Sequence, residues 1–196
     1  MLREIGGGRW DVRRTLREAS DGQLGRVGGA LRELARSRGD AVEIVRDRAA
    51  ASDATSVQRG ALDVLATTAW GTLRVRWDDV RHAPGSIENV GFWRRGGDAR
   101  QVWEAFALER GEVLGRLWGV ESLADLTVTE TEPLGEQFTI ARGERTLGGL
   151  PVDGEFFEAM VTTAASPVGA GLLHRINAAV SRTRPALPAE PRDRWL

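Results

Sequence analysis

The apolar residues of this chain change their spacing near Gly71, and this change constrains the fold more than any other feature of the sequence. Before Gly71 they recur at helical spacing, in a segment that begins after Thr55. Beyond it, Leu73, Val75 and Trp77 alternate with arginines, the pattern of a strand with one buried and one solvated face. The sequence therefore predicts a helix that ends at Gly71 and is followed by a half-buried strand.

Two capping-box patterns predict where helices begin. Thr55 is followed by Gln58 and Asp98 by Gln101, so that each pair can satisfy the free N–H groups of a first helical turn. The predicted buried positions of the first helix are Val57, Ala61, Val64, Leu65 and Thr68. Those of the second are Val102, Trp103, Phe106, Val113, Leu114, Leu117 and Trp118, with Gly119 as its end.

The remaining segments complete an α+β pattern. Helices are expected near Val12–Leu16 and over 21–38, 55–70, 98–118, 154–165 and 167–180, although the run Val161–Thr163 also fits an extended conformation. Strands are expected over 73–77, 87–93, 126–131 and 137–142, and around 146–147, whereas 41–51 fits either state. We predict a single α+β domain in which about five to six helices flank a mostly antiparallel sheet built from hairpins.

The ends of the chain differ from its middle in composition. Residues 1–10 contain three consecutive glycines and are predicted to form a flexible N-terminal arm. Residues 11–182 are predicted to form a single globular domain. Residues 183–196 form a Pro-rich C-terminal tail, because proline lacks the N–H donor of regular structure. The tail carries Trp195 and Leu196, an apolar pair suited to docking on a partner or on a second copy, or to folding back over the domain.

The chain contains no Cys or Tyr, and all 27 of its basic residues are arginine. A Schiff-base lysine, a phosphate loop ending in Gly-Lys-Ser/Thr and a thiolate nucleophile or metal ligand are therefore excluded. Only His82 and His174 titrate near neutral pH. These exclusions favour a protein that is not an enzyme, and we expect no cofactor and no metal.

The net charge and the hydropathy of the sequence limit which partners and which cell compartment we expect. The formal net charge of −1 argues against general binding of polyanions, so nucleic acid is not expected as a partner. The sequence has neither a long apolar run nor an apolar export segment at its start. We expect a cytoplasmic protein without membrane contact.

A first candidate site is a patch of arginines between aromatic rings. Its members are Arg74, Arg76, Arg94 and Arg95, with Trp77 and Trp93 at its edges. Guanidinium groups hold carboxylates or phosphates and stack on rings, so the patch could bind an anionic partner. Strand alternation alone, however, already explains Arg74 and Arg76 as the solvated side of a strand.

A second candidate combines carboxylates with an imidazole. Its members are Asp78, Asp79, His82 and Glu88. Such groups serve in acid–base catalysis or metal binding. One histidine without a second nitrogen ligand nearby fits an exposed loop residue equally well.

Three functions are compatible with these patterns. The first is a non-enzymatic interaction protein, an adaptor, assembly or regulatory subunit, which recognises another protein or a second copy of itself through exposed Trp and Arg. The second is a domain or enzyme that binds a small anion with carboxylates, His82 and an arginine. The third is local nucleic-acid binding through Arg74, Arg76, Arg94 and Arg95.

Overall fold

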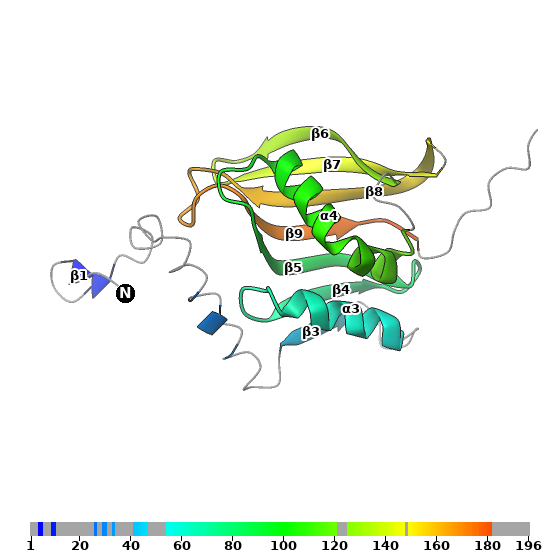
Figure 1. The fold of residues 1–196 in the computed structure, drawn as a ribbon, viewed down its shortest axis with the longest axis horizontal. Helices are drawn as coiled ribbons and strands as arrows, with labels where there is room; N and C mark the ends of the chain where they lie inside the picture. Colours follow the sequence, from blue (N-terminus) through cyan, green and yellow to red (C-terminus); the bar gives the residue numbers. More distant parts are fainter. Residues whose placement is uncertain are drawn as a thin grey trace, which may run out of the picture.

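The computed structural model describes residues 4–5, 9–10, 26, 29–30, 33, 41–46, 54–120, 125–147 and 149–181. Most of these belong to one seven-stranded sheet with two helices lying across it (Figure 1). The predicted single α+β domain with a mostly antiparallel sheet is confirmed. A separate antiparallel pair joins β1 (Glu4–Ile5) to β2 (Arg9–Trp10).

The strands of the sheet are β3 (Val42–Arg46), β4 (Leu73–Asp78), β5 (Ala83–Trp93), β6 (Leu126–Leu134), β7 (Phe138–Leu147), β8 (Leu150–Thr162) and β9 (Leu172–Ala178). Across the sheet their order is β3-β4-β5-β9-β8-β7-β6. The β3–β4 pair is parallel, and every other pair is antiparallel. The last strand among the described residues, β9, is therefore the middle strand of the sheet, and it lies between two strands that are distant from each other in sequence.

The two helices begin where the capping boxes predict. Helix α3 (Ser56–Ala66) has Thr55 as its N-cap, and α4 (Ala99–Trp118) has Asp98, each with both reciprocal hydrogen bonds present. Helix α4 ends at Gly119, whose φ of 67° lies in the left-handed region that glycine adopts without strain. Local sequence thus fixes both ends of α4.

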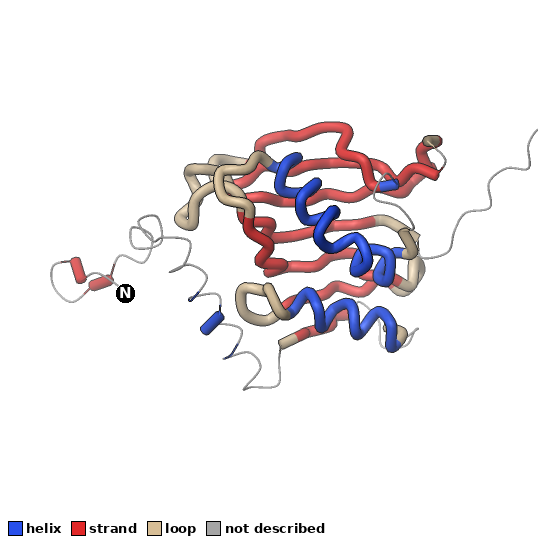
Figure 2. Tube along the Cα trace, viewed as in Figure 1, coloured by secondary structure: helices blue, strands red, loops and turns tan. Residues whose placement is uncertain are grey.

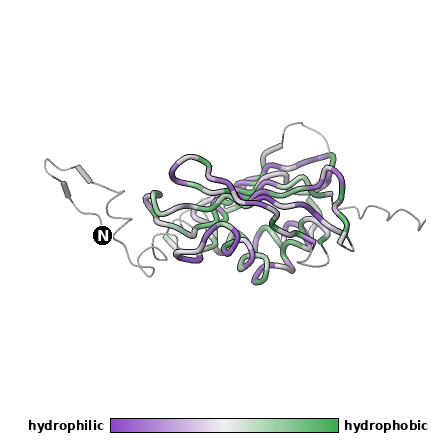
Figure 3. The backbone as a smooth tube through the Cα atoms, turned by 90° about the horizontal axis from the view of Figure 1, so that it is seen from above, coloured by the Kyte–Doolittle hydropathy of each residue, from purple (hydrophilic) through white to green (hydrophobic). Residues whose placement is uncertain are grey.

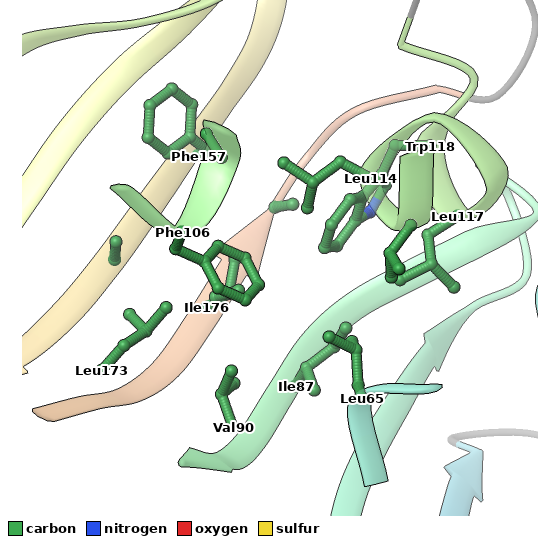
Figure 4. Packing of buried hydrophobic residues seen from close by; sticks show 14 of the residues in the cluster. Leu65, Ile87, Val90, Phe106, Leu114, Leu117, Trp118, Phe157, Leu173 and Ile176 are labelled. Atoms are coloured by element: carbon green, nitrogen blue, oxygen red, sulfur yellow. The ribbon is translucent and has the colours of Figure 1, made fainter. Parts of the chain in front are cut away.

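Both helices lie on the same side of the sheet (Figures 1 and 2), as the view from above also shows (Figure 3). All seven predicted core positions of α4 are buried. Trp103 stacks on Phe157 of β8 with ring centroids 4.3 Å apart, and its neighbour Phe106 meets Phe92 of β5 edge-on at 5.3 Å. The core therefore fills the space between the helices and one face of the sheet (Figure 4).

Helix α3 is rotated about its axis relative to the prediction. Val57 is 50% exposed and Val64 also lies at the surface, whereas Gln58 is buried. The Gln58 side chain donates to the main-chain oxygens of His82 at 2.9 Å and Leu117 at 3.1 Å. The Gln58 amide, with its two acceptors, is therefore buried where the apolar pattern predicted the side chain of Val57.

The predicted number of helices is wrong. Within the described ranges only α3 and α4 are delimited, and the helices expected near Val12–Leu16 and over 21–38 fall almost entirely outside those ranges. The segments expected as helices over 154–165 and 167–180 instead contain most of β8 and all of β9. Residues 41–51, which fitted either state, contain β3.

Candidate functional site on the uncovered face of the sheet

Strand alternation places a row of polar side chains on the face of the sheet away from the helices. On β4, Leu73, Val75 and Trp77 are buried, whereas Arg74 and Arg76 are exposed. No helix or strand among the described residues lies over this second face, which we call the open face.

The register of the strands arranges the open face in two rows. The first row reads Arg74, Glu88, Arg175, Met160, Ile140 and Glu132 across six strands. The second reads Arg76, Ser86, Asn177, Glu158, Arg142 and Glu130. Residues directly opposite on neighbouring strands contact each other, so each row is a chain of adjoining side chains.

Ion pairs fix the charged groups of the first row. Arg74 Nε lies 3.1 Å from Glu43 Oε2 on β3, and an Arg175 guanidinium nitrogen lies 2.7 Å from Glu88 Oε1. These side chains are a third or more exposed, so each pair contributes only about 0.2–1 kcal/mol to stability. Their main effect is to hold a defined pattern of charge on the surface.

Arg142 organises the charges of the second row. Its guanidinium donates to Glu158 at 2.9 Å, lies 2.7 Å from Glu132 and is 3.8 Å from Glu130. The hydrogen bond to Glu158, together with the charges of Glu132 and Glu130, raises the pKa of Arg142 above its ordinary value. Asn177 Nδ2 also donates to Glu158, which links this cluster to β9.

A groove of about 910 Å³ crosses β4, β5 and β9 on this face. Its polar lining includes Arg74, Arg76, Asp78, Asp79, Ser86, Glu88, Arg175 and Asn177. Val75 and Trp77 also line the groove, although their side chains lie in the core on the other face of β4. The groove thus brings three arginines together with three carboxylates and two neutral hydrogen-bonding groups.

A tight turn closes one end of the groove. Asp78 accepts hydrogen bonds from the main-chain N–H groups of Val80 and Arg81, and its other oxygen lies 2.8 Å from the Arg81 guanidinium. Partial burial acts to raise the pKa of Asp78, but the hydrogen bonds from Arg81 and Val80 outweigh it, so this pKa lies below its ordinary value. Asp78 is therefore held as a carboxylate that supports the turn.

The structure divides the predicted arginine patch. Arg74 and Arg76 share the groove, but Trp77 is only 2% exposed and lies in the core instead of at the edge of the patch. Arg94 and Arg95 follow the far end of β5, six positions beyond the Glu88 that faces Arg74, which is roughly 15–20 Å along a strand. The four arginines therefore do not form one patch.

Trp93 lies with the distant pair of arginines. Its ring stacks on Trp70, with centroids 5.8 Å apart and the planes inclined by 15°. The next residue, Arg94, donates its main-chain N–H to Gly171 at 2.8 Å. Trp93 thus belongs to an aromatic pair at the opposite end of the sheet from the turn after β4.

The predicted acid–imidazole cluster does not assemble. Asp78 and Asp79 lie at one end of the groove, whereas Glu88 lies four strand positions away, opposite Arg74, and pairs with Arg175. His82 is an exposed turn residue outside the groove, with a φ of 52°. In the part of the chain that the structure describes, no three His, Asp or Glu side chains are placed to hold a metal ion.

His174 is half-buried on β9, beside the ring of Phe138 at 5.9 Å between centroids. Burial lowers the pKa of His174, the charge of Arg175 lowers it further, and the charge of Glu88 acts in the opposite direction. The surroundings of His174 therefore favour the neutral imidazole over the charged form.

Sequence reasoning missed the groove residues Arg175 and Asn177, because it assigned their segment to a helix. A signal was present, since these two residues alternate with Ile176 and Ala178, both of which are buried. The predicted docking residues Trp195 and Leu196 lie outside the described residues.

Comparison with protein-family models, curated proteins and solved structures finds no match to this chain. In the described part of the chain, neither α3 nor α4 combines the length and the apolar character that crossing a membrane requires. The functional argument therefore depends on the geometry of the open face.

Proposed function

We propose that this protein is a non-enzymatic interaction protein that holds another protein against the open face of its sheet. The observation that supports this proposal is the groove over β4, β5 and β9, whose charged walls are fixed by ion pairs. The side chains of such a surface are already ordered in the free protein, so little side-chain conformational entropy is lost when a partner binds.

The charge pattern of the groove favours specific recognition over general adhesion. Positive and negative groups alternate across the first row, from Glu43 to Arg74, Glu88 and Arg175. A partner must present the complementary alternation, and a misplaced charge would face a like charge. Ser86 and Asn177 in the second row add neutral hydrogen-bonding groups that can read a peptide backbone.

A pair of charge reversals tests the proposal. Arg74→Glu combined with Arg76→Glu changes the groove, whereas Arg94→Glu combined with Arg95→Glu makes the same change in charge at the far end of β5. We expect chemical cross-linking in the native cells, read by quantitative mass spectrometry, to show a bound protein that the groove variant loses and the control variant keeps. An identical set of cross-linked proteins for both variants would contradict the proposal.

The groove also favours a second function, the binding of a small anion. Of the residues predicted for an anion site, Arg74, Arg76 and Glu88 line one groove, together with Asp78 and Asp79. If phosphate binds there, a concentration ten times its Kd stabilises the protein by about 1.4 kcal/mol, which raises the Tm by roughly 3–6 °C.

The control for this second function is Arg76→Gln, measured in phosphate and in chloride at matched ionic strength. The variant should lose the difference in Tm between the two salts if the groove holds the anion. A wild-type Tm that is the same in both salts argues against an anion site and leaves the protein-binding proposal in place.

A further inference from the structure

The open face carries opposite charges at its two edges. On β4 the two rows present Arg74 and Arg76, and on β6 they present Glu132 and Glu130. The side chains of Arg74 and Glu130 are each 61% exposed, and that of Glu132 is 41% exposed. These arginines and glutamates are separated by five strand spacings, which is about 24 Å across one surface.

The charged groups of the strands between these edges compensate one another. Glu88 on β5 pairs with Arg175 on β9 at 2.7 Å, and Glu158 on β8 pairs with Arg142 on β7 at 2.9 Å. Across the sheet the two rows are therefore positive on β4, neutral in the middle and negative on β6. A surface with this order is complementary to a copy of itself that has been rotated by half a turn.

A third row on the open face, nearer to the end of β5, is largely apolar. This apolar row consists of Trp93 on β5, Leu172 on β9, Thr162 on β8, Phe138 on β7 and Leu134 on β6. Trp93 follows Phe92, whose ring meets Phe106 of α4, so the Trp93 side chain lies on the open face. Leu134 is 47% exposed, and Trp93 and Phe138 are partly exposed. Burial of these groups would favour association.

We infer that the partner held on the open face is a second copy of this chain. The two sheets pack face to face about 10 Å apart, with their strands aligned to within about 30°. They are related by a two-fold axis that runs along the strands between β9 and β8. In this dimer β4 faces β6 of the second copy, β5 faces β7, and β9 faces β8. The inference rests on the proposed function, because it names the molecule that the open face binds.

The strand register determines which side chains meet in this dimer. Arg74 faces Glu132 of the second copy in the first row, and Arg76 faces Glu130 in the second row. The other opposed pairs are Glu88 with Ile140, Arg175 with Met160, Ser86 with Arg142, and Asn177 with Glu158. Among these twelve side chains, no charged group faces a like charge.

A two-fold axis across the strands would instead place each strand on its own copy. Arg74 and Arg76 of the two copies would then face one another over β4, and Glu130 and Glu132 would do so over β6. Like charges that lie opposite each other repel, so this arrangement is disfavoured. Charge therefore selects the arrangement in which β4 faces β6.

The open face is large enough for a stable dimer. Six strands at about 4.8 Å each, and the seven residues of β9 at about 3.3 Å each, cover roughly 29 Å by 23 Å. The two copies together bury on the order of 1,300 Å², which is within the range of about 1,200–2,000 Å² for specific complexes. In the apolar row Trp93 faces Phe138 of the second copy, and aromatic side chains are enriched in such interfaces.

Reciprocal charge reversal tests the inference in the full chain. The β4 variant carries Arg74→Glu and Arg76→Glu, and the β6 variant carries Glu130→Arg and Glu132→Arg. Within each variant all opposed edge positions have the same charge, so the dimer Kd should rise at least about 100-fold. In an equimolar mixture of the two variants every edge pair is again unlike. The mixture should therefore form a dimer whose Kd is within about tenfold of the wild-type value.

Sedimentation velocity over a series of concentrations measures these dissociation constants. The control variant, Glu104→Arg with Glu109→Arg, makes the same change in charge on the exposed side of α4 and should leave the Kd unchanged. Far-UV circular dichroism and the Tm show whether each variant keeps the fold. The single reversals Arg76→Glu and Glu130→Arg repeat the test with a smaller change in charge.

Three results would overturn the inference. The first is a wild-type chain that stays monomeric at every concentration at which it is soluble. The second is a dimer that the folded β4 and β6 variants retain, and the third is a mixture of folded variants that stays monomeric. If the wild-type chain is monomeric while cross-linking in the native cells still depends on Arg74 and Arg76, the proposed function stands with a different partner. If that cross-linking is unchanged in the groove variant, the proposed function fails as well.

Discussion

Replacing Arg145 by methionine removes a buried arginine at the junction of β7, β8 and α4. Arg145 is 1% exposed, and its guanidinium pairs with Glu155 at 2.9 Å, donates to the Ser181 oxygen and reaches the Gly119 oxygen at 3.3 Å. The substitution leaves a carboxylate that is only 8% exposed without its counterion, and two main-chain oxygens without a donor.

The expected loss is large because the pair is buried. Breaking a buried ion pair by removing one partner costs about 3–5 kcal/mol. For a chain of this length, that corresponds to a fall in Tm of roughly 6–20 °C. Replacing both partners by methionine, Arg145→Met with Glu155→Met, removes the stranded charge and should recover most of the loss.

Urea unfolding followed by tryptophan fluorescence measures these free energies. The exposed pair supplies the control, since Arg74→Met leaves Glu43 in solvent and should cost less than about 1 kcal/mol. A loss below about 1 kcal/mol for Arg145→Met would refute the assignment of a buried, stability-determining pair. A double variant no more stable than the single one would refute the reason given for the loss.

Three further predictions concern the core and its edges. The pKa of His174 is lowered in the folded state, so the free energy of unfolding should fall as pH drops through the ordinary histidine pKa of about 6.5. In His174→Phe the urea midpoint should depend less on pH between 7.5 and 5.5, and an unchanged dependence would refute this. At Gly171 (φ +103°) a Cβ would lie 1.9 Å from the Arg94 oxygen, so Gly171→Ala should lower the free energy of unfolding by more than about 3 kcal/mol. Gly149 also has a positive φ but open space around it, so Gly149→Ala should cost only about 1–2 kcal/mol. Equal losses for the two variants in thermal unfolding would contradict this. Gln58→Met should cost about 1–3 kcal/mol, because two main-chain oxygens lose their donor, and a neutral result in urea unfolding would argue against these bonds.

The sequence predicted those elements whose local signals agree with their tertiary surroundings. Helix α4 has a capping box at Asp98, an apolar stripe and an end signal at Gly119, and each of these lies where it was expected. The alternation on β4 likewise predicted which side chains face solvent. In both cases the residues that fix the element lie within it.

Prediction failed where distant segments decide the structure. Leu172, Leu173, Ile176 and Val180 fit helical spacing, yet this segment forms β9 because β5 and β8 flank it on both sides. A strand at the centre of a sheet gains hydrogen bonds along both edges, which outweighs local spacing. Nothing in the local sequence indicates those two neighbours.

The same limit explains which parts of the site were predicted. Arg74 and Arg76 were recognised from their own strand, whereas Arg175 and Asn177 enter the groove only through the pairing of β9 with β5. The separation of Arg94 from Arg74 follows from the length of β5, which the sequence pattern underestimated. Sites that are assembled across strands require the register, and the register is a property of the whole sheet.

Site-specific photo-cross-linking tests most directly whether the open face is the binding surface. A photoreactive residue replaces Ser86, in the groove, or Glu104, exposed on α4, and the full chain is irradiated in its native cells. We predict a discrete cross-linked protein from position 86 that is absent from position 104. Equal cross-linking from both positions, or cross-linking from position 104 alone, would contradict the account.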